Sequence, residues 1–383
     1  FMNYTILDFL QLIGSLGVFL FGMKMMSEAL QKVAGNKMRT ILAAMTSNRV
    51  KGVITGLLIT TIIQSSSATT VMVVSFVNAG LLSLTQSVSV IMGANVGTTV
   101  TAWIISIFGF KVNISLFAIP LIGLAIPFIF SGNSRRRSWG EFIIGFAFLF
   151  MGLEFLKNSV PDIQNNPEIL SFLTEYTNMG YLSVLLFLLI GTIVTIVVQS
   201  SSATMAITLI MCSKGWISFD IAAAMVLGEN IGTTITALLA SIGQSKNAKR
   251  TAIVHSIFNI SGSIVFVFII PLFAKFVQFI SPKGNEVDVI SRQIANAHTA
   301  FNVFCTVIWL PLIPVMVKIV TTIIRGKDKT VVMDQAPQYL DDKMIGKPLP
   351  AMYLVSEEMK RLANYSEMMV SALKDSISGV GGS

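Results

Sequence analysis

The sequence predicts an all-α polytopic membrane protein: an inverted-repeat fold with two re-entrant helical hairpins and two broken helices. Three observations lead to this fold class. Of 383 residues, 53% are hydrophobic and only 12% are charged, about half the charged share of a soluble domain. Long stretches carry no charge at all, and two polar blocks recur inside them at a fixed offset. The composition excludes a water-soluble enzyme and a disordered chain.

The charge-free stretches locate the membrane elements. Residues 52–110 and 176–213 contain no Asp, Glu, Lys or Arg. A spanning helix needs ~20 apolar residues, so the first stretch alone has room for two or three segments. We therefore expect membrane elements at 6–30, 52–82, 84–110, 112–133, 138–157, 181–214, 217–243, 250–280 and 290–324.

An internal repeat relates two parts of the chain. The segment 56–70 recurs at 191–205 with the shared core Gln-Ser-Ser-Ser-Ala-Thr, and 93–102 recurs at 228–237 as Gly-x-Asn-x-Gly-Thr-Thr. Both recurrences have an offset of 135 residues. Chance similarity between apolar stretches does not keep two polar blocks in register, so the sequence indicates a duplication.

Each repeated block interrupts an apolar stretch with polar side chains or glycines. Irregular backbone at membrane depth persists only where it is buried in protein or lines a wet cavity. Paired interruptions in two halves therefore point to a transporter binding site. We expect a turn in each Gln-Ser-Ser-Ser segment and a helix break in each Gly-x-Asn-x-Gly-Thr-Thr segment, at 64–67, 199–202, 93–99 and 228–234.

The basic residues decide whether 52–82 crosses the membrane or turns back. The arm from Gly52 to Ile63 reaches only ~18 Å into a ~30 Å core. If both Gln-Ser-Ser-Ser segments turn back, the basic clusters share one side, which the positive-inside bias makes cytoplasmic. These clusters lie at 32–51, 135–137, 246–250 and 325–329. The acidic loop with Asp162, Glu168 and Glu175 then lies outside. We expect hairpins from opposite sides and a cytoplasmic C-terminus.

The repeated blocks suit an anion together with a cation. Half-helix N-termini offer free N–H donors, and the hydroxyls that follow Gln64 and Gln199 add more, which suits an oxyanion. Helix C-termini and Gln and Thr oxygens suit a hard cation such as Na⁺. The blocks hold no Lys or Arg, so bound cations would supply the charge for the anion, which is the physical basis of symport. Glu229, which replaces Ala94, is a functional candidate as an intramembrane carboxylate.

Other polar residues in the apolar stretches have simpler interpretations. His255 and Asn259 lie one helical turn apart, as do His298 and Asn302, and we expect interhelical hydrogen bonds rather than a proton relay. Ser75, outside the repeated blocks, is expected to contribute packing alone. An intramembrane serine hydrolase, with one serine of 65–67 and a histidine base, is the alternative from another class. Two triple-serine copies without a G-x-S-x-G motif argue against it.

The blocks at 64–70, 93–99, 199–205 and 228–234 resemble the duplicated motifs of the type II sodium–phosphate cotransporter family. The resemblance covers about residues 6–324. It implies a cell-membrane symporter, not an enzyme, that imports inorganic phosphate by alternating access with Na⁺ as the co-transported ion. The phosphate ligands that it implies are Ser65, Ser66, Ser67, Asn95, Thr98, Thr99, Ser200, Ser201, Ser202, Asn230, Thr233 and Thr234. The implied sodium ligands are Gln64, Ser65, Thr69, Thr99, Gln199, Ser200, Thr204 and Glu229.

The composition changes after Arg325. Residues 326–350 are polar and contain three prolines, and Met352 to Ile377 has the pattern of an amphipathic helix. This tail looks like the first helix of the PhoU-type domain that prokaryotic members of the family carry. We expect membrane repeat 1 at 1–135, membrane repeat 2 with an extra C-terminal span at 136–324, a linker at 325–350, and the start of a truncated cytoplasmic PhoU-like domain at 351–383.

Two functional alternatives stay open for a membrane protein with these motifs. Neutral donors and helix ends would also bind sulfate, arsenate or a dicarboxylate, so a Na⁺-coupled carrier of another anion is one of them. A membrane phosphate sensor that acts through the tail is the other. Phosphate, sodium and the lipid bilayer are the partners that we expect, with no role for nucleic acid. The sequence leaves the oligomeric state open.

Overall fold

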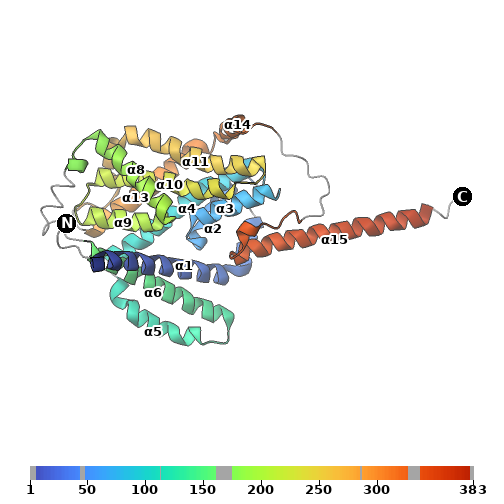
Figure 1. Cartoon of the computed structure of the whole chain (residues 1–383), viewed down its shortest axis with the longest axis horizontal. Helices are drawn as coiled ribbons and strands as arrows, with labels where there is room; N and C mark the ends of the chain where they lie inside the picture. The colour runs from blue at the N-terminus through green and yellow to red at the C-terminus, as the bar shows by residue number, and fades with distance from the viewer. Residues whose placement is uncertain are drawn as a thin grey trace.

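The computed structural model describes residues 6–43, 48–112, 114–160, 175–284, 287–326 and 337–379, and this part of the chain is almost entirely helical (Figure 1). Six of its helices are long and apolar enough to cross a membrane. The predicted all-α polytopic class is confirmed. Asp162 and Glu168 lie outside the described residues. The main helices are α1 (Ile6–Ala43), α2 (Arg49–Ile63), α3 (Ser66–Asn78), α4 (Leu84–Ile104), α5 (Ala118–Ile129), α6 (Ser134–Ser159), α8 (Tyr181–Val198), α9 (Ser201–Ser213), α10 (Phe219–Ala240), α11 (Lys246–Phe268), α12 (Ile270–Ile280), α13 (Val287–Trp309), α14 (Ile313–Ile323) and α15 (Pro348–Gly379).

The first repeat folds into a helical hairpin. α2 ends at Ile63 and α3 begins at Ser66, so the expected break in 64–67 is confirmed. α2 runs parallel to α4, since Gly52 packs against Ser89 and Gly97 against Leu57. α3 leads back through a short turn to the start of α4. The hairpin therefore begins and ends at one end of the bundle.

The second repeat has the same arrangement in the opposite direction. α8 and α9 are separated at residues 199–200, and α8 packs in parallel against α10 through Gly191 and Gly232. Asn78, at the end of α3, accepts a hydrogen bond from the backbone N–H of Ser245, just after α10. α4 therefore starts where α10 ends, and the two repeats are antiparallel within the bundle.

The predicted helix breaks at 93–99 and 228–234 are wrong. α4 and α10 run continuously through both Gly-x-Asn-x-Gly-Thr-Thr blocks. The glycines are needed instead for close approach between helices: a Cβ on Gly93 would lie 1.9 Å from the carbonyl oxygen of Val53, and one on Gly228 would lie 2.0 Å from that of Leu188. Small residues let membrane helices approach this closely. The real breaks of the repeats are those at the two Gln-Ser-Ser-Ser segments.

Two other expected membrane elements are each divided into two helices in the structure. The expected element 250–280 consists of α11 and α12, and the expected span 290–324 consists of α13 and α14, which meet at 86°. Pro271 lies in the first turn of α12, and Pro311 and Pro314 lie at the bend before and within α14. Proline lacks the N–H of a helix interior and disfavours helical backbone before it, which explains both divisions.

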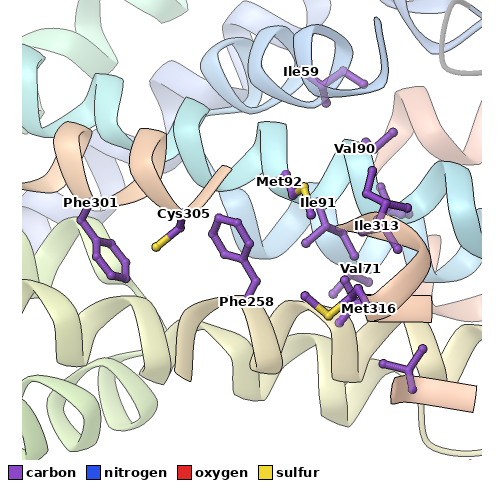
Figure 2. Packing of buried hydrophobic residues seen from close by; sticks show 14 of the residues in the cluster. Ile59, Val71, Val90, Ile91, Met92, Phe258, Phe301, Cys305, Ile313 and Met316 are labelled. Atoms are coloured by element: carbon purple, nitrogen blue, oxygen red, sulfur yellow. The ribbon is translucent and has the colours of Figure 1, made fainter. Parts of the chain in front are cut away.

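The core of the bundle lies where the two repeats meet α11, α13 and α14. Figure 2 shows Ile91 and Met92 of α4 pointing toward Phe258 of α11, with Met316 of α14 close by. All four side chains are at most 1% exposed. A second cluster joins α1 and α6 to α9 and α10. The hairpins therefore pack against the buried faces of the neighbouring helices.

Basic residues gather at one end of the bundle, which we call the basic end. Arg250 of α11 donates to the carbonyls of Ile324 and Gly326 there. Lys32 of α1 and Arg137 of α6 both pair with Glu141. In Figure 1 the turn between α5 and α6 lies toward α15, and α1 contacts α15. The basic clusters at 135–137 and 246–250 thus share one end, as the hairpin interpretation requires.

The glycine contacts between the paired helices lead to a stability prediction. Gly93→Ala and Gly228→Ala place a Cβ against backbone, and overpacking of this kind typically costs about 1–3 kcal/mol. We expect each variant to lower the thermal midpoint of the detergent-solubilised protein. Gly14→Ala in α1 is the matched control, because nothing lies within 4 Å of its Cβ position. Equal midpoints for Gly93→Ala and Gly14→Ala would contradict this role of the glycines.

Candidate functional site

The two hairpin tips have the same local structure. Gln64 and Gln199 both adopt left-handed backbone with φ 55°, the only described non-glycine residues with positive φ. One left-handed residue ends the first arm, and the next residue begins the second arm as its N-cap. Ser65 accepts a hydrogen bond from the N–H of Ala68, and Ser200 does the same for Ala203. The repeated Gln-Ser pair therefore determines where each helix stops and restarts.

Side chains satisfy the backbone groups that the first tip exposes. The amide of Gln64 donates to the carbonyl of Thr61 and its Oε1 accepts from Thr101 at 3.0 Å. The hydroxyl of Ser27, from α1, donates to the carbonyl of Ile63 at the end of α2. An unpaired carbonyl in a protein interior is costly. These bonds hold the tip in one position against α1 and α4.

Both tips line one cavity of about 360 Å³. The predicted site residues that it brings together are Gln64, Ser65, Ser66, Ser67, Thr98, Gln199, Ser200, Ser201 and Ser202. A hydrogen bond of 3.1 Å from Thr236 of α10 to Ser67 also connects the second repeat directly to the tip of the first. Segments 135 residues apart in the sequence thus meet around one space.

The cavity has the electrostatics of an anion site. The first turns of α3 and α9 both border it, at Ser66 and Ser201. The first N–H groups of a helix have no intrahelical acceptor, and the helix dipole places partial positive charge there. Two such N-termini with neighbouring serine hydroxyls offer convergent donors to an oxyanion. Neither helix N-terminus carries an acidic residue in its first turn.

The other predicted site residues do not line this cavity. Thr69 and Thr204 bond within their own hairpins, to Thr60 and Thr195. The remaining hydroxyls and amides each donate to a carbonyl of their own helix, and all of these residues are at most 7% exposed. They are Asn95, Thr99, Asn230, Thr233 and Thr234.

Glu229 is buried beside the second hairpin. Its Oε1 accepts a hydrogen bond of 2.7 Å from Thr208 of α9, and the side chain is 1% exposed. Its Oε2 has no hydrogen-bond partner in the described part of the chain. The first repeat has Val73 and Ala94 at the equivalent positions. This polar pair is therefore a property of the second repeat alone.

One histidine and the two asparagines that follow the histidines contact asparagines of the repeated blocks. His255 Nε2 lies 3.3 Å from Asn95 Oδ1, which also accepts from Asn259. Asn302, one turn after His298, donates to Asn230 at 3.4 Å. The expected interhelical bonding is confirmed for His255, Asn259 and Asn302. The described hydrogen bonds connect neither histidine to a triple-serine segment, so the geometry of a serine hydrolase is not present.

The cavity also contains residues that the sequence analysis did not include. α1 contributes Ser27, Lys24, Glu28 and Gln31, and the tail contributes Gly346, Lys347 and Pro348. Lys24 and Glu28 form an i,i+4 ion pair of 3.9 Å. Charged residues in an otherwise apolar span are functional candidates, so the sequence did contain a signal for α1. It contained no such signal for Lys347.

Ser75 has a partner in the tail and is not a packing residue alone. Its hydroxyl donates to Asp341 Oδ2 at 2.6 Å. The two residues are 266 positions apart in the sequence, and the expectation for Ser75 was wrong because this contact forms only when the tail docks. α3 is therefore coupled at its far end to the tail.

A bundle of membrane-length helices with a serine-lined cavity between two antiparallel hairpins is typical of a polytopic membrane transporter. The chain belongs to the Na⁺/Pi-cotransporter family, whose sequence profile matches residues 18–158 and 167–294. Members of this family transport phosphate and are not enzymes. The family match includes both copies of the repeated motifs and therefore both hairpin tips.

Relatives of the chain include bacterial and mammalian proteins. An uncharacterised protein, YqeW of Bacillus subtilis, is 31% identical over 69% of this chain and 83% of its own length. The putative inorganic phosphate export protein YjbB of Salmonella typhimurium is 26% identical over 97% of this chain, which spans 66% of that relative's length. Sodium-dependent phosphate transport protein 2A of Rattus norvegicus is 37% identical over 25% of this chain and 15% of its own length. No solved structure matches the chain.

Proposed function

We propose that the chain is a sodium-coupled secondary transporter that moves inorganic phosphate inward by alternating access. The observation that carries the proposal is the single cavity between two Gln-Ser-Ser-Ser tips of antiparallel hairpins. Inverted repeats with a central site are typical of carriers that alternate between two openings. The family assignment supports phosphate as the anion and sodium as the coupling ion.

In this proposal phosphate is bound by the tip residues that line the cavity. The hydroxyls of Ser66, Ser67, Ser201 and Ser202 and the first N–H groups of α3 and α9 are the donors. Asn95, Thr99, Asn230, Thr233 and Thr234 support the tips from the neighbouring helices α4 and α10. We assign direct contact with phosphate only to residues that line the cavity, and these are fewer than the polar residues of the motifs.

Sodium is proposed to bind through oxygen atoms close to the same tips. The side-chain oxygens of Gln64 and Gln199, with the carbonyls that end α2 and α8, form one candidate group. Glu229 is a further candidate, because Oε2 is buried without a described hydrogen-bond partner and a buried carboxylate requires a counter-charge. Bound sodium would offset the negative charge of phosphate, which makes the two bind together.

The direction of transport has two candidates. A cell that keeps sodium low inside drives a sodium symporter inward, which favours import. The relatives named as putative phosphate export proteins favour the second candidate, outward movement. Proteoliposomes with a sodium gradient of either sign distinguish the two, because a symporter follows the gradient and an exporter of another type does not.

Phosphate binding should require sodium. Titration of inorganic phosphate by calorimetry in sodium buffer is expected to show binding, and the same titration in choline buffer is expected to show a large loss of affinity. The reason is the shortage of basic groups at the tips, where phosphate charge would otherwise be uncompensated. Equal affinity in both buffers would refute the coupling. Competition by sulfate, arsenate or a dicarboxylate at lower concentration would identify another anion as the substrate.

The two serine triplets should both contribute to phosphate binding. Ser66→Ala and Ser201→Ala each remove a donor to a charged ligand, which typically costs about 1.5–3 kcal/mol, roughly ten- to a hundred-fold in affinity. Ser89→Ala is the control, because its hydroxyl is also buried and, among the described residues, bonds only to the carbonyl of Gln86 in its own helix. The shared site is contradicted if either triplet tolerates alanine with phosphate affinity unchanged.

The basic end should face the cytoplasm. Arg136→Cys at the basic end is expected to react with a membrane-impermeant maleimide only from the cytoplasmic side, and Asn178→Cys, just before α8, only from outside. Arg136 and Asn178 are both exposed, and the native cysteines Cys212 and Cys305 are buried, which keeps background labelling low. Labelling of both positions from the same side would contradict the prediction that the two ends of the bundle lie on opposite sides of the membrane.

A further inference from the structure

The segment before α15 is docked on the basic end of the bundle. Asp341 accepts hydrogen bonds from Ser75 at 2.6 Å and from Gln244 at 3.5 Å. The ammonium group of Lys343 donates to the carbonyls of Ala240 and Ile242, where α10 ends. The segment therefore contacts the hairpin arm of repeat 1 and a helix of repeat 2 at the same time.

Apolar contacts hold the first turns of α15 in the same place. Met344 and Leu354 are each 1% exposed and belong to the main hydrophobic cluster. The ring of Tyr353 lies 5.3 Å from that of Phe76 of α3. Glu358 accepts hydrogen bonds from the backbone N–H groups at 338 and 339, which closes the segment onto its own helix. Contacts between the tail and the bundle are thus made both before and after residues 346–348 in the sequence.

Residues 346–348 form part of the wall of the cavity between the hairpin tips. Lys347 precedes α15, and its carbonyl accepts the first backbone hydrogen bond of that helix. Burial lowers the pKa of Lys347, and Asp341 acts in the opposite direction. The described residues provide no ion pair or hydrogen bond to its ammonium group. The tail therefore brings a partly buried basic group to a space lined by serine hydroxyls.

The charge balance of the cavity makes this lysine important. The Gln-Ser-Ser-Ser blocks contain no basic residue. Among the described lining residues the basic ones are Lys24 and Lys347, and Lys24 is paired with Glu28, which lines the same cavity. Lys347 is thus the lining cation that no lining carboxylate balances. A partly desolvated ammonium is an effective partner for an oxyanion.

We propose that Lys347 is a phosphate-binding residue, which the docked tail delivers to the cavity and which the serine tips alone do not replace. This inference rests on the proposed phosphate site between the tips. It makes the tail part of the binding site, and the contacts of Asp341 with Ser75 and Gln244 position the lysine. A tail that leaves its docked position would take the positive charge with it and lower the affinity for phosphate.

The test is a titration of inorganic phosphate into the purified full chain at saturating sodium. Lys347→Gln is expected to weaken phosphate binding roughly ten-fold or more, in the range for a lost hydrogen bond to a charged group. Lys347→Arg should restore most of the affinity because it keeps the charge. Lys360→Gln is the matched control, since Lys360 lies exposed on α15 and pairs with Glu357 outside the cavity.

Asp341→Asn tests the positioning role. It should weaken binding by a smaller factor than Lys347→Gln, and the double variant should be no weaker than Lys347→Gln alone, because both act through one lysine. Unchanged affinity in Lys347→Gln, with Ser66→Ala and Ser201→Ala impaired, would overturn this inference and leave the tip site standing. Unchanged affinity in all three would overturn the tip site itself. A loss in Lys347→Gln that Lys347→Arg does not restore would show a structural role only and would also overturn it.

Discussion

The two interrupted backbones at Gln64 and Gln199 are the constraint on which the rest of the structure depends. A helix that stops inside a protein leaves carbonyls at one end and N–H groups at the next start without helical partners. Each such group is costly away from water unless it finds a partner. The N-cap serines and the bond from Ser27 to the end of α2 satisfy several of them. The groups that stay available are the first N–H groups of α3 and α9, and these border the cavity.

The glycine contacts make this arrangement possible. Glycines at 93 and 97 let α4 approach α2 at backbone distance, and those at 228 and 232 do the same for α10 and α8. This approach brings Thr101 within 3.0 Å of Gln64. The geometry of the tips thus depends on the close packing of the paired helices. Both depend on a motif whose glycines never leave helical conformation.

The sequence allowed the hairpins, the repeat and the tip residues to be predicted, because those signals are local. The Gln-Ser-Ser-Ser runs interrupt an apolar stretch with residues that end and cap helices, and the fixed offset relates the two copies. The glycines at 93–99 and 228–234 were misinterpreted because glycine serves both irregular backbone and close approach, and only the partner helix shows which applies. The bends before α12 and α14 have a signal in the sequence, at Pro271, Pro311 and Pro314, that the sequence analysis did not use. The contacts of Lys347 and Ser75 could not be predicted, since they join parts of the chain far apart in sequence.

The two halves share their sequence motif but differ in hydrogen bonding. Thr101 and Thr236 are equivalent under the repeat, yet Thr101 donates to the glutamine of its own tip and Thr236 donates to Ser67 of the other tip. Gln64 is correspondingly buried, at 6% exposed, whereas Gln199 is more open. The two tips therefore share their backbone geometry but differ in their hydrogen-bond partners. A sequence alignment would treat Thr101 and Thr236 as interchangeable. In the structure each threonine donates to a different acceptor, so the same substitution at the two positions removes two different contacts.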